Sequence, residues 1–115
     1  MVKEYTTEKR EVLSVDNART IKRGMISVVE DELGTGYNAK IENIQVGGKT
    51  GTTEYLDKEK KCSDGWFAGF FRYNDKYYSM IVFIPQSKEV QGESKIACTV
   101  FKEIVSNLID KKFIQ

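Results

Sequence analysis

The fold of this chain is decided by one short polar stretch, Gly47-Gly48-Lys49-Thr50-Gly51-Thr52-Thr53. We expect it to be extended, because it lies between a helical pattern and two apolar strand patterns. Side chains of a strand alternate between its faces, so Thr50 and Thr52 should point one way and Lys49 the other. Gly51 would leave room for a second extended chain. The stretch is a candidate docking site for an anionic peptide, and the simpler alternative is a glycine-rich turn with solvated side chains.

Composition favours one small folded domain. A chain of 115 residues is long enough for one core, and 40% hydrophobic content with a single proline argues against disorder. The net charge is +1 with both signs intermixed, so we expect no nucleic-acid partner. There is no apolar run of membrane-spanning length, and residues 1–10 lack the apolar core of a signal peptide. If the function is extracellular, we expect the exporting segment to lie outside this chain.

The sequence contains no histidine, which removes the commonest general base and the commonest metal ligand. Its two cysteines, Cys62 and Cys98, are far apart and have no metal-binding spacing. They could pair or stay free. We therefore predict no metal site and no cofactor.

An amphipathic helix is predicted between about residues 18 and 29. Ser14 or Asp16 could cap its start, and Gly34 or Gly36 could end it in a left-handed conformation. Gly24 inside the helix would then indicate close packing against a neighbour. The apolar stripe consists of Ala18, Ile21, Met25, Val28 and Val29. The charged side chains off this stripe, which we expect to be solvated, are Arg19, Lys22, Arg23 and Glu30.

After a loop or short helical turn at residues 37–43, three strands are expected. The first begins at Ile44 and runs into the lysine–threonine stretch, and a polar surface loop covers residues 55–64. Residues 65–72 and 77–84 form a hairpin around a turn at residues 73–76, and Pro85 closes the last strand. Both faces of these two strands are apolar or aromatic, and we expect the aromatics and Met80 in the core. Layers on both sides, or a central position in a sheet, would explain this pattern.

A loop at residues 86–92 and a second amphipathic helix complete the chain, with Ser94 as a possible cap. The stripe of this helix consists of Ala97, Val100, Phe101, Ile104, Val105 and Leu108. The fold class predicted is α+β: a three-stranded antiparallel meander flanked by an N-terminal and a C-terminal helix, with residues 1–115 as a single domain.

The lysine–threonine stretch could be a nucleotide-binding phosphate loop, but its context is wrong. Such a loop needs a glycine five residues before the Gly-Lys-Thr triplet and a helix directly after it. Here that position is Asn43, and residues 51–54 do not resemble a helix start. The other interpretation is a Lys-Thr-Gly box on a strand.

With the box, the order of elements resembles the C-terminal part of a penicillin-binding protein transpeptidase domain, most like the class B type. The helix with Gly34-Thr35-Gly36 after it, the box at residues 46–52, and Asp64-Gly65-Trp66-Phe67-Ala68-Gly69-Phe70 are similar to that family. Gly92 and the last helix fit as well. The resemblance covers roughly residues 12–110 and implies a partial β-lactamase/transpeptidase-like fold.

The resemblance implies a substrate-binding role for Lys49, Thr50, Gly51 and Thr52. The Thr50 and Thr52 hydroxyls would hold the terminal carboxylate of a D-Ala-D-Ala stem peptide or of a β-lactam. The Thr52 backbone N–H would supply half of an oxyanion hole. Lys49 would add positive field, and Gly51 would let the substrate pair with the strand edge.

The chain departs from the family in its nucleophile. The family uses a Ser-x-x-Lys motif and a Ser-x-Asn motif, and no serine here is followed by lysine at that spacing. We therefore predict a fragment of a peptidoglycan D,D-transpeptidase that has no catalytic side chain and is inactive alone. Its parent would be anchored in the bacterial plasma membrane with this domain outside the cytoplasm.

Two alternatives to the transpeptidase fragment stay open, a fragment of a related β-lactam sensor domain and a small non-catalytic α+β binding module. In the complete family fold the strand at residues 77–84 would have another strand beside it, and here that neighbour would be missing unless the N-terminal segment takes its place. A long apolar edge invites pairing with a second chain, so we predict a homo-oligomer.

Overall fold

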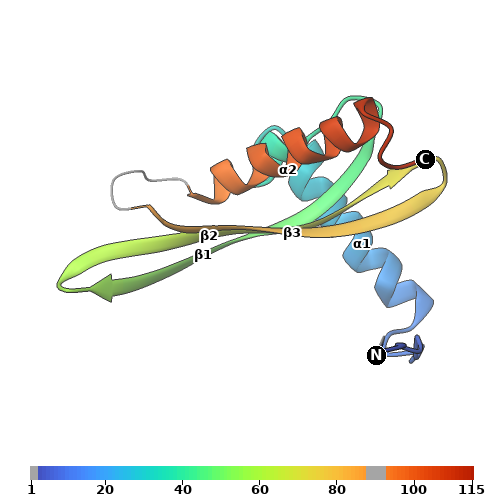
Figure 1. The fold of residues 1–115 in the computed structure, drawn as a ribbon, viewed down its shortest axis with the longest axis horizontal. Helices are drawn as coiled ribbons and strands as arrows, with labels where there is room; N and C mark the ends of the chain where they lie inside the picture. Colours follow the sequence, from blue (N-terminus) through green and yellow to red (C-terminus); the bar gives the residue numbers. More distant parts are fainter. Residues whose placement is uncertain (1–2, 88–92) are drawn as a thin grey trace.

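A computed structural model describes residues 3–87 and 93–115 and shows a three-stranded sheet with helices on both faces (Figure 1). The elements are α1 (Val15–Glu30), a short 3-10 helix η1 (Tyr37–Ala39), β1 (Gln45–Asp57), β2 (Lys60–Tyr73), β3 (Lys76–Ser87) and α2 (Glu93–Asp110). The strands pair antiparallel in the order β1-β2-β3. The predicted α+β meander flanked by two helices is confirmed, as is the helical turn within residues 37–43.

The core lies between the sheet and α2. Phe67 and Phe71 of β2 are buried beneath this helix, where the ring centroids of Phe67 and Phe101 lie 4.9 Å apart in an edge-to-face contact. Phe71 also stacks on Tyr78 of β3, with 5.1 Å between centroids. The predicted stripe of α2 supplies most of the helix side of this core: Ala97, Phe101 and Val105 are buried.

Helix α1 lies on the other face of the sheet and contacts the strands from Lys22 onward, mainly through its C-terminal half. Val29 is buried, whereas Ala18 and Ile21 are exposed, so the predicted stripe is wrong in its first half. The reason is visible in Figure 1, where the N-terminal half of α1 extends away from the strands. Gly24 does not mark close packing either, because no atom lies within 4 Å of the position a Cβ would take.

Both ends of α1 have local explanations. Ser14, not Asp16, is the N-cap: its hydroxyl oxygen accepts a hydrogen bond from the Asn17 N–H at 3.2 Å. The predicted left-handed glycine cap is wrong, because the helix ends at Glu30 with Asp31 as an extended C-cap, and no glycine in the described part of the chain has a left-handed φ. Gly34 is required for a different reason, since a Cβ there would lie 2.1 Å from the Val28 carbonyl oxygen.

The polar segment at residues 55–64 is not a surface loop. It forms the end of a long β1–β2 hairpin that projects beyond both helices (Figure 1). Its two-residue turn is Lys58-Glu59, with φ of 51° and 69°. The predicted β2–β3 turn is confirmed, with Asn74 and Asp75 at φ of 49° and 63°. Two consecutive left-handed residues give the backbone twist that antiparallel strands need.

Strand β3 is an edge strand and runs past Pro85, so the prediction that this proline closes it is wrong. Pro85 is tolerated because the pairing with β2 is irregular there, between Ser63 and Gly65. Of the predicted loop at residues 86–92, the first two positions belong to β3, and residues 88–92, including Gly92, lie outside the described residues. Ser94 is inside α2 rather than at its cap.

One face of β2 and β3 is only partly covered. Trp66, Tyr77 and Phe83 are 38%, 52% and 43% exposed, which contradicts the prediction that all the aromatics are in the core. Trp66 and Phe83 contact each other on this face, with ring centroids 4.2 Å apart. Helix α1 reaches the end of the sheet near Gly47 but not this pair. The two-sided apolar pattern therefore reflects one face covered by α2 and one face that α1 covers only in part.

Candidate functional site

The lysine–threonine stretch lies within β1 and is extended, as predicted. Thr50 is paired with Phe67 and Thr52 with Gly65, so both threonines share the face that α2 covers. Lys49 is paired with Ala68, on the opposite face. The alternation of hydroxyls and ammonium is thereby confirmed. Strand β1 is also an edge of the sheet, and within the described residues its outer side has no neighbouring strand.

The two threonines differ in exposure. Thr50 is 8% exposed, and its Oγ1 donates to Oγ1 of Thr35 at 2.9 Å. Thr52 is exposed. The structure therefore places one hydroxyl of the predicted pair in a contact within the chain and leaves the other open. Thr35 belongs to the loop after α1 and was not among the predicted site residues.

The glycines of the stretch have two different roles. A Cβ at Gly47 or Gly48 would lie 2.6 Å from a ring carbon of Phe70 or 2.3 Å from one of Phe67, so these two residues are needed for packing. At Gly51 the contact would be an ordinary 3.5 Å, to Cβ of Trp66. Packing inside the chain does not require glycine at position 51, which leaves the predicted close approach of another chain as a reason for it.

Lys49 is exposed, and its ammonium lies along β1 itself. Its Nζ donates to the backbone carbonyl of Thr50 at 2.6 Å. The ion pairs found among residues 3–87 and 93–115 join Arg10 with Glu8, Lys40 with Glu30, and Arg72 with Asp75. None of these three pairs involves Lys49, whose exposed ammonium lies along β1.

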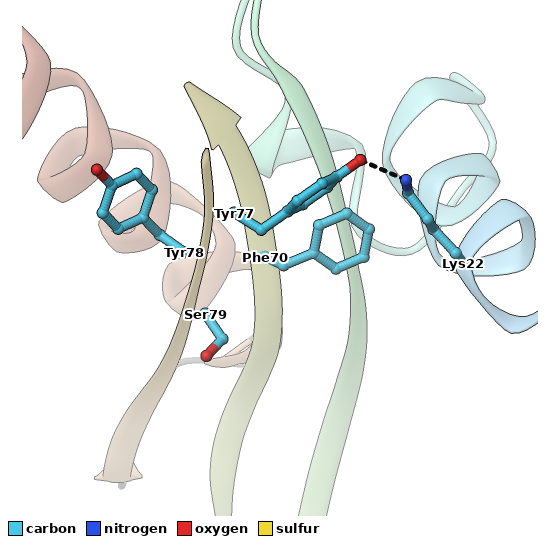
Figure 2. Close-up of a pocket in the computed structure, with 5 residues that line it drawn as sticks. All are labelled: Lys22, Phe70, Tyr77, Tyr78 and Ser79. Atoms are coloured by element: carbon cyan, nitrogen blue, oxygen red, sulfur yellow. Dashed lines mark hydrogen bonds between the residues drawn. The ribbon is translucent and has the colours of Figure 1, made fainter. Parts of the chain in front are cut away.

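A second group of polar side chains lies between α1 and the sheet, in a shallow pocket shown in Figure 2. Nζ of Lys22 donates to the hydroxyl oxygen of Tyr77 and lies 4.5 Å from the centre of that ring. This hydrogen bond lowers the pKa of Tyr77. Lys22 was predicted to be solvated, which is wrong. Its position beside the apolar stripe was the only signal in the sequence that could have indicated the contact.

The same pocket includes a serine, Ser79, but not a nucleophile–base pair. Figure 2 shows its side chain directed away from the Lys22 ammonium. No hydrogen bond between the two is present in the described part of the structure. Among the described residues, no three or more acidic, cysteine or histidine side chains are grouped so that they could hold a metal ion.

Comparison with protein families identifies a relative for nearly the whole chain. The sequence model of the penicillin binding protein transpeptidase domain matches residues 2–106. Penicillin-binding protein 3 of Bacillus subtilis (strain 168) is 31% identical over 101 residues, which are 85% of this chain and 15% of that protein. Stage V sporulation protein D of the same strain is 31% identical over 110 residues, which are 93% of this chain and 16% of that protein.

Solved structures of transpeptidase domains share the fold. The transpeptidase domain of penicillin-binding protein 3 from Burkholderia pseudomallei superposes with a TM-score of 0.64 and 22% identity, over 84% of this chain and 30% of that one. The D,D-transpeptidase domain of a peptidoglycan glycosyltransferase from Eggerthella lenta superposes with a TM-score of 0.65 and 23% identity, over 99% of this chain and 25% of that one. The chain thus spans less than a third of either domain and about a sixth of the two curated relatives.

Proposed function

Because the chain belongs to the penicillin-binding protein transpeptidase family, we propose that it is the C-terminal part of a peptidoglycan D,D-transpeptidase domain and supplies one wall of the active-site cleft. The observation that carries this proposal is an extended edge strand with an open glycine between two threonines, one of them exposed, and an exposed lysine in the same stretch.

In the proposed site, β1 binds the end of an extended stem peptide, or a β-lactam that resembles it. The exposed Thr52 hydroxyl donates to the substrate carboxylate together with Thr50, and Lys49, on the opposite face of β1, adds a positive field to the strand. Backbone groups of alternate strand residues face the same edge, so the N–H groups of Thr50 and Thr52 share one side. In the proposed site this is the unpaired side of β1, where the Thr52 N–H acts as an oxyanion-hole donor.

Gly51 has a separate part in the proposal. Its Cβ position is open, so a substrate backbone can approach β1 as an added strand would. A larger residue at this position would keep the fold and obstruct the ligand. Gly47 and Gly48 differ from Gly51 in this respect, because a side chain at either of them would clash with an aromatic ring of β2.

We propose that this chain is inactive on its own, because it has no Ser-x-x-Lys motif to supply the nucleophile. We expect a fluorescent penicillin to leave it unlabelled on a denaturing gel, while a complete transpeptidase domain treated in parallel is labelled. A covalent adduct on this chain, located by mass spectrometry of its peptides, would show that a nucleophile is present and that the proposal of an inactive wall is wrong.

Non-covalent binding tests the wall itself. We expect a peptide ending in D-Ala-D-Ala to shift the amide resonances of residues 49–52 weakly in an NMR titration, and its C-terminal amide, which lacks the carboxylate charge, to shift them less. Thr52→Val should weaken binding by about tenfold or more, because a hydrogen bond to a charged group contributes about 1.5–3 kcal/mol. Thr53→Val is the matched control, since Thr53 is exposed and faces the other side of β1. Equal shifts with acid and amide would count against a carboxylate site.

We further propose that the parent protein is anchored in the bacterial plasma membrane and holds this domain outside the cytoplasm. Within the described residues no helix is long and apolar enough to cross a bilayer. The anchor would then belong to a part of the parent that this chain does not match. Localisation of the parent with a reporter fused to this chain tests the proposal, and a cytoplasmic reporter signal would refute it.

A further inference from the structure

The loop after α1 is held in place by close backbone contacts. A Cβ at Gly34 would lie 2.1 Å from the Val28 carbonyl oxygen, and the Gly36 N–H donates to that same oxygen at 3.1 Å. A Cβ at Gly36 would lie 2.9 Å from Val28 Cγ1 and 3.3 Å from the Phe67 ring. Thr35, between these two glycines, is therefore fixed against the end of α1 and the edge of β1.

The side chain of Thr35 meets the proposed substrate-binding residue Thr50 at an Oγ1–Oγ1 distance of 2.9 Å. Thr50 is almost buried, whereas Thr35 is exposed. Fifteen residues separate the two in sequence, so their contact depends on the loop and not on local geometry. A hydroxyl donates one hydrogen bond and accepts up to two, so this contact leaves each hydroxyl with capacity for another partner.

We propose that Thr35 is a positioning residue for the carboxylate-binding hydroxyl of Thr50, an inference that rests on the proposed function. Without ligand, Thr50 donates to Thr35. When a carboxylate binds, the Thr50 proton turns to it, and Thr35 donates to Thr50 in return. Only two O–H bonds rotate, and the side chains keep their rotamers. The resulting chain of hydrogen bonds runs in one direction and strengthens the bond to the anion.

The first test uses the free protein and needs no ligand. The χ1 angle of Thr50 is measured through NMR couplings to its methyl carbon. We expect a single rotamer in the wild type and in Thr35→Ser, and rotamer averaging in Thr35→Val, which keeps the shape but loses the hydroxyl. The control is Thr99→Val, which removes a threonine hydroxyl that bonds the Lys95 carbonyl on α2, far along the chain. A single rotamer in Thr35→Val would overturn the proposal.

The second test measures affinity for the D-Ala-D-Ala peptide by the same titration as above. Thr35→Val should weaken binding about fivefold, while Thr35→Ser and Thr99→Val should bind as the wild type does. If the bond serves only to hold the loop, Thr35→Val will lower stability to denaturant and leave both the Thr50 rotamer and the affinity unchanged, which refutes a positioning role. If the wild type binds no peptide, the proposed function fails, and the rotamer test alone decides whether Thr35 orients Thr50.

Discussion

At the scale of single residues, the glycines of this chain show how one residue type answers several physical demands. Gly47 and Gly48 make room for phenylalanine rings of β2, and Gly34 makes room for a backbone carbonyl. Gly51 and Gly24 meet no such obstacle inside the chain. Where a Cβ would be unobstructed, glycine is either needed for contact with a partner outside the chain or not needed structurally. Replacing it with a larger residue distinguishes these two cases.

Gly24→Ala should stabilise the protein by about 1 kcal/mol, because alanine is the better helix former and its methyl group meets nothing within 4 Å. Urea unfolding followed by circular dichroism measures the change. Gly34→Ala serves as the opposing control, since its methyl group would lie 2.1 Å from the Val28 carbonyl oxygen and must displace backbone. A Gly24→Ala protein less stable than the wild type would mean that α1 is packed against something at this position.

The candidate site was only partly predictable at this scale. Alternation along a strand predicts that Thr50 and Thr52 share a face, and the pairing of β1 with β2 confirms it. Alternation does not predict that Thr50 is buried and bonded to Thr35, because this depends on how a loop fifteen residues away folds back. Nor does it predict the contact of Lys22 with Tyr77, which joins elements fifty-five residues apart.

At the scale of elements, the two hairpin turns have the same backbone and unequal sequences. Asn74-Asp75 has the residue types that tolerate left-handed φ, and its turn was predicted correctly. Lys58-Glu59 adopts the same conformation without such residues, and the sequence therefore indicated a loop. The hairpin forms because the strands on both sides pair in register, from Asp57 with Lys60 inward. Tertiary pairing has overridden local preference.

This mismatch predicts a stabilising substitution. Replacing Lys58-Glu59 by Asn-Gly removes the steric cost of left-handed φ, which is about 1 kcal/mol or more per residue. We expect the double variant to unfold at higher denaturant concentration and to protect the amides at the end of the hairpin from hydrogen exchange. Lys61→Gly is the control: it lies within β2, where glycine should destabilise the strand. No gain for the double variant would indicate that this end of the hairpin is already frayed.

The apolar stripes of the two helices also show where local sequence predicts the structure and where tertiary packing decides it. The stripe of α2 was predicted from period alone, and most of it packs on the sheet as expected, but Ile104 is exposed, so the prediction is wrong at that position. The stripe of α1 has the same period, yet Ala18 and Ile21 are exposed because the sheet ends before they reach it. Periodicity states which side of a helix is apolar. It does not state how far the covering surface extends.

At the scale of the whole molecule, the helices of this chain leave part of the apolar surface of the sheet exposed. Trp66, Ile81 and Phe83 form an exposed apolar group on the face that α1 leaves open, at 38%, 67% and 43% exposure. Both outer strands of the described sheet lack a neighbour. The chain matches less than a third of the solved transpeptidase domains from Burkholderia pseudomallei and Eggerthella lenta, so their folds contain further polypeptide besides the shared unit.

The edge of β3 is unprotected over most of its length. Between Tyr77 and Ile84 it carries no charge and no proline, residues that commonly prevent edge strands from associating, and only Lys76 and Pro85 flank this stretch. Two copies could pair these edges antiparallel about a two-fold axis, which closes the assembly at a dimer. The pairing would place the exposed Ile81 and Phe83 of each copy next to those of the other. Hydrogen bonding and apolar burial would then favour the same contact.

We therefore expect the isolated chain to sediment as a dimer at high micromolar concentration and to dissociate on dilution. Ile81→Lys places a charge on the edge strand in the apolar group and should give a monomer. Leu33→Lys is the matched control, because Leu33 is 94% exposed and lies in the loop after α1, away from β3. A monomer at every concentration would contradict self-association. A dimer that persists in Ile81→Lys would place the contact elsewhere, with the free edge of β1 as the next strand to test by the same substitution at Thr53.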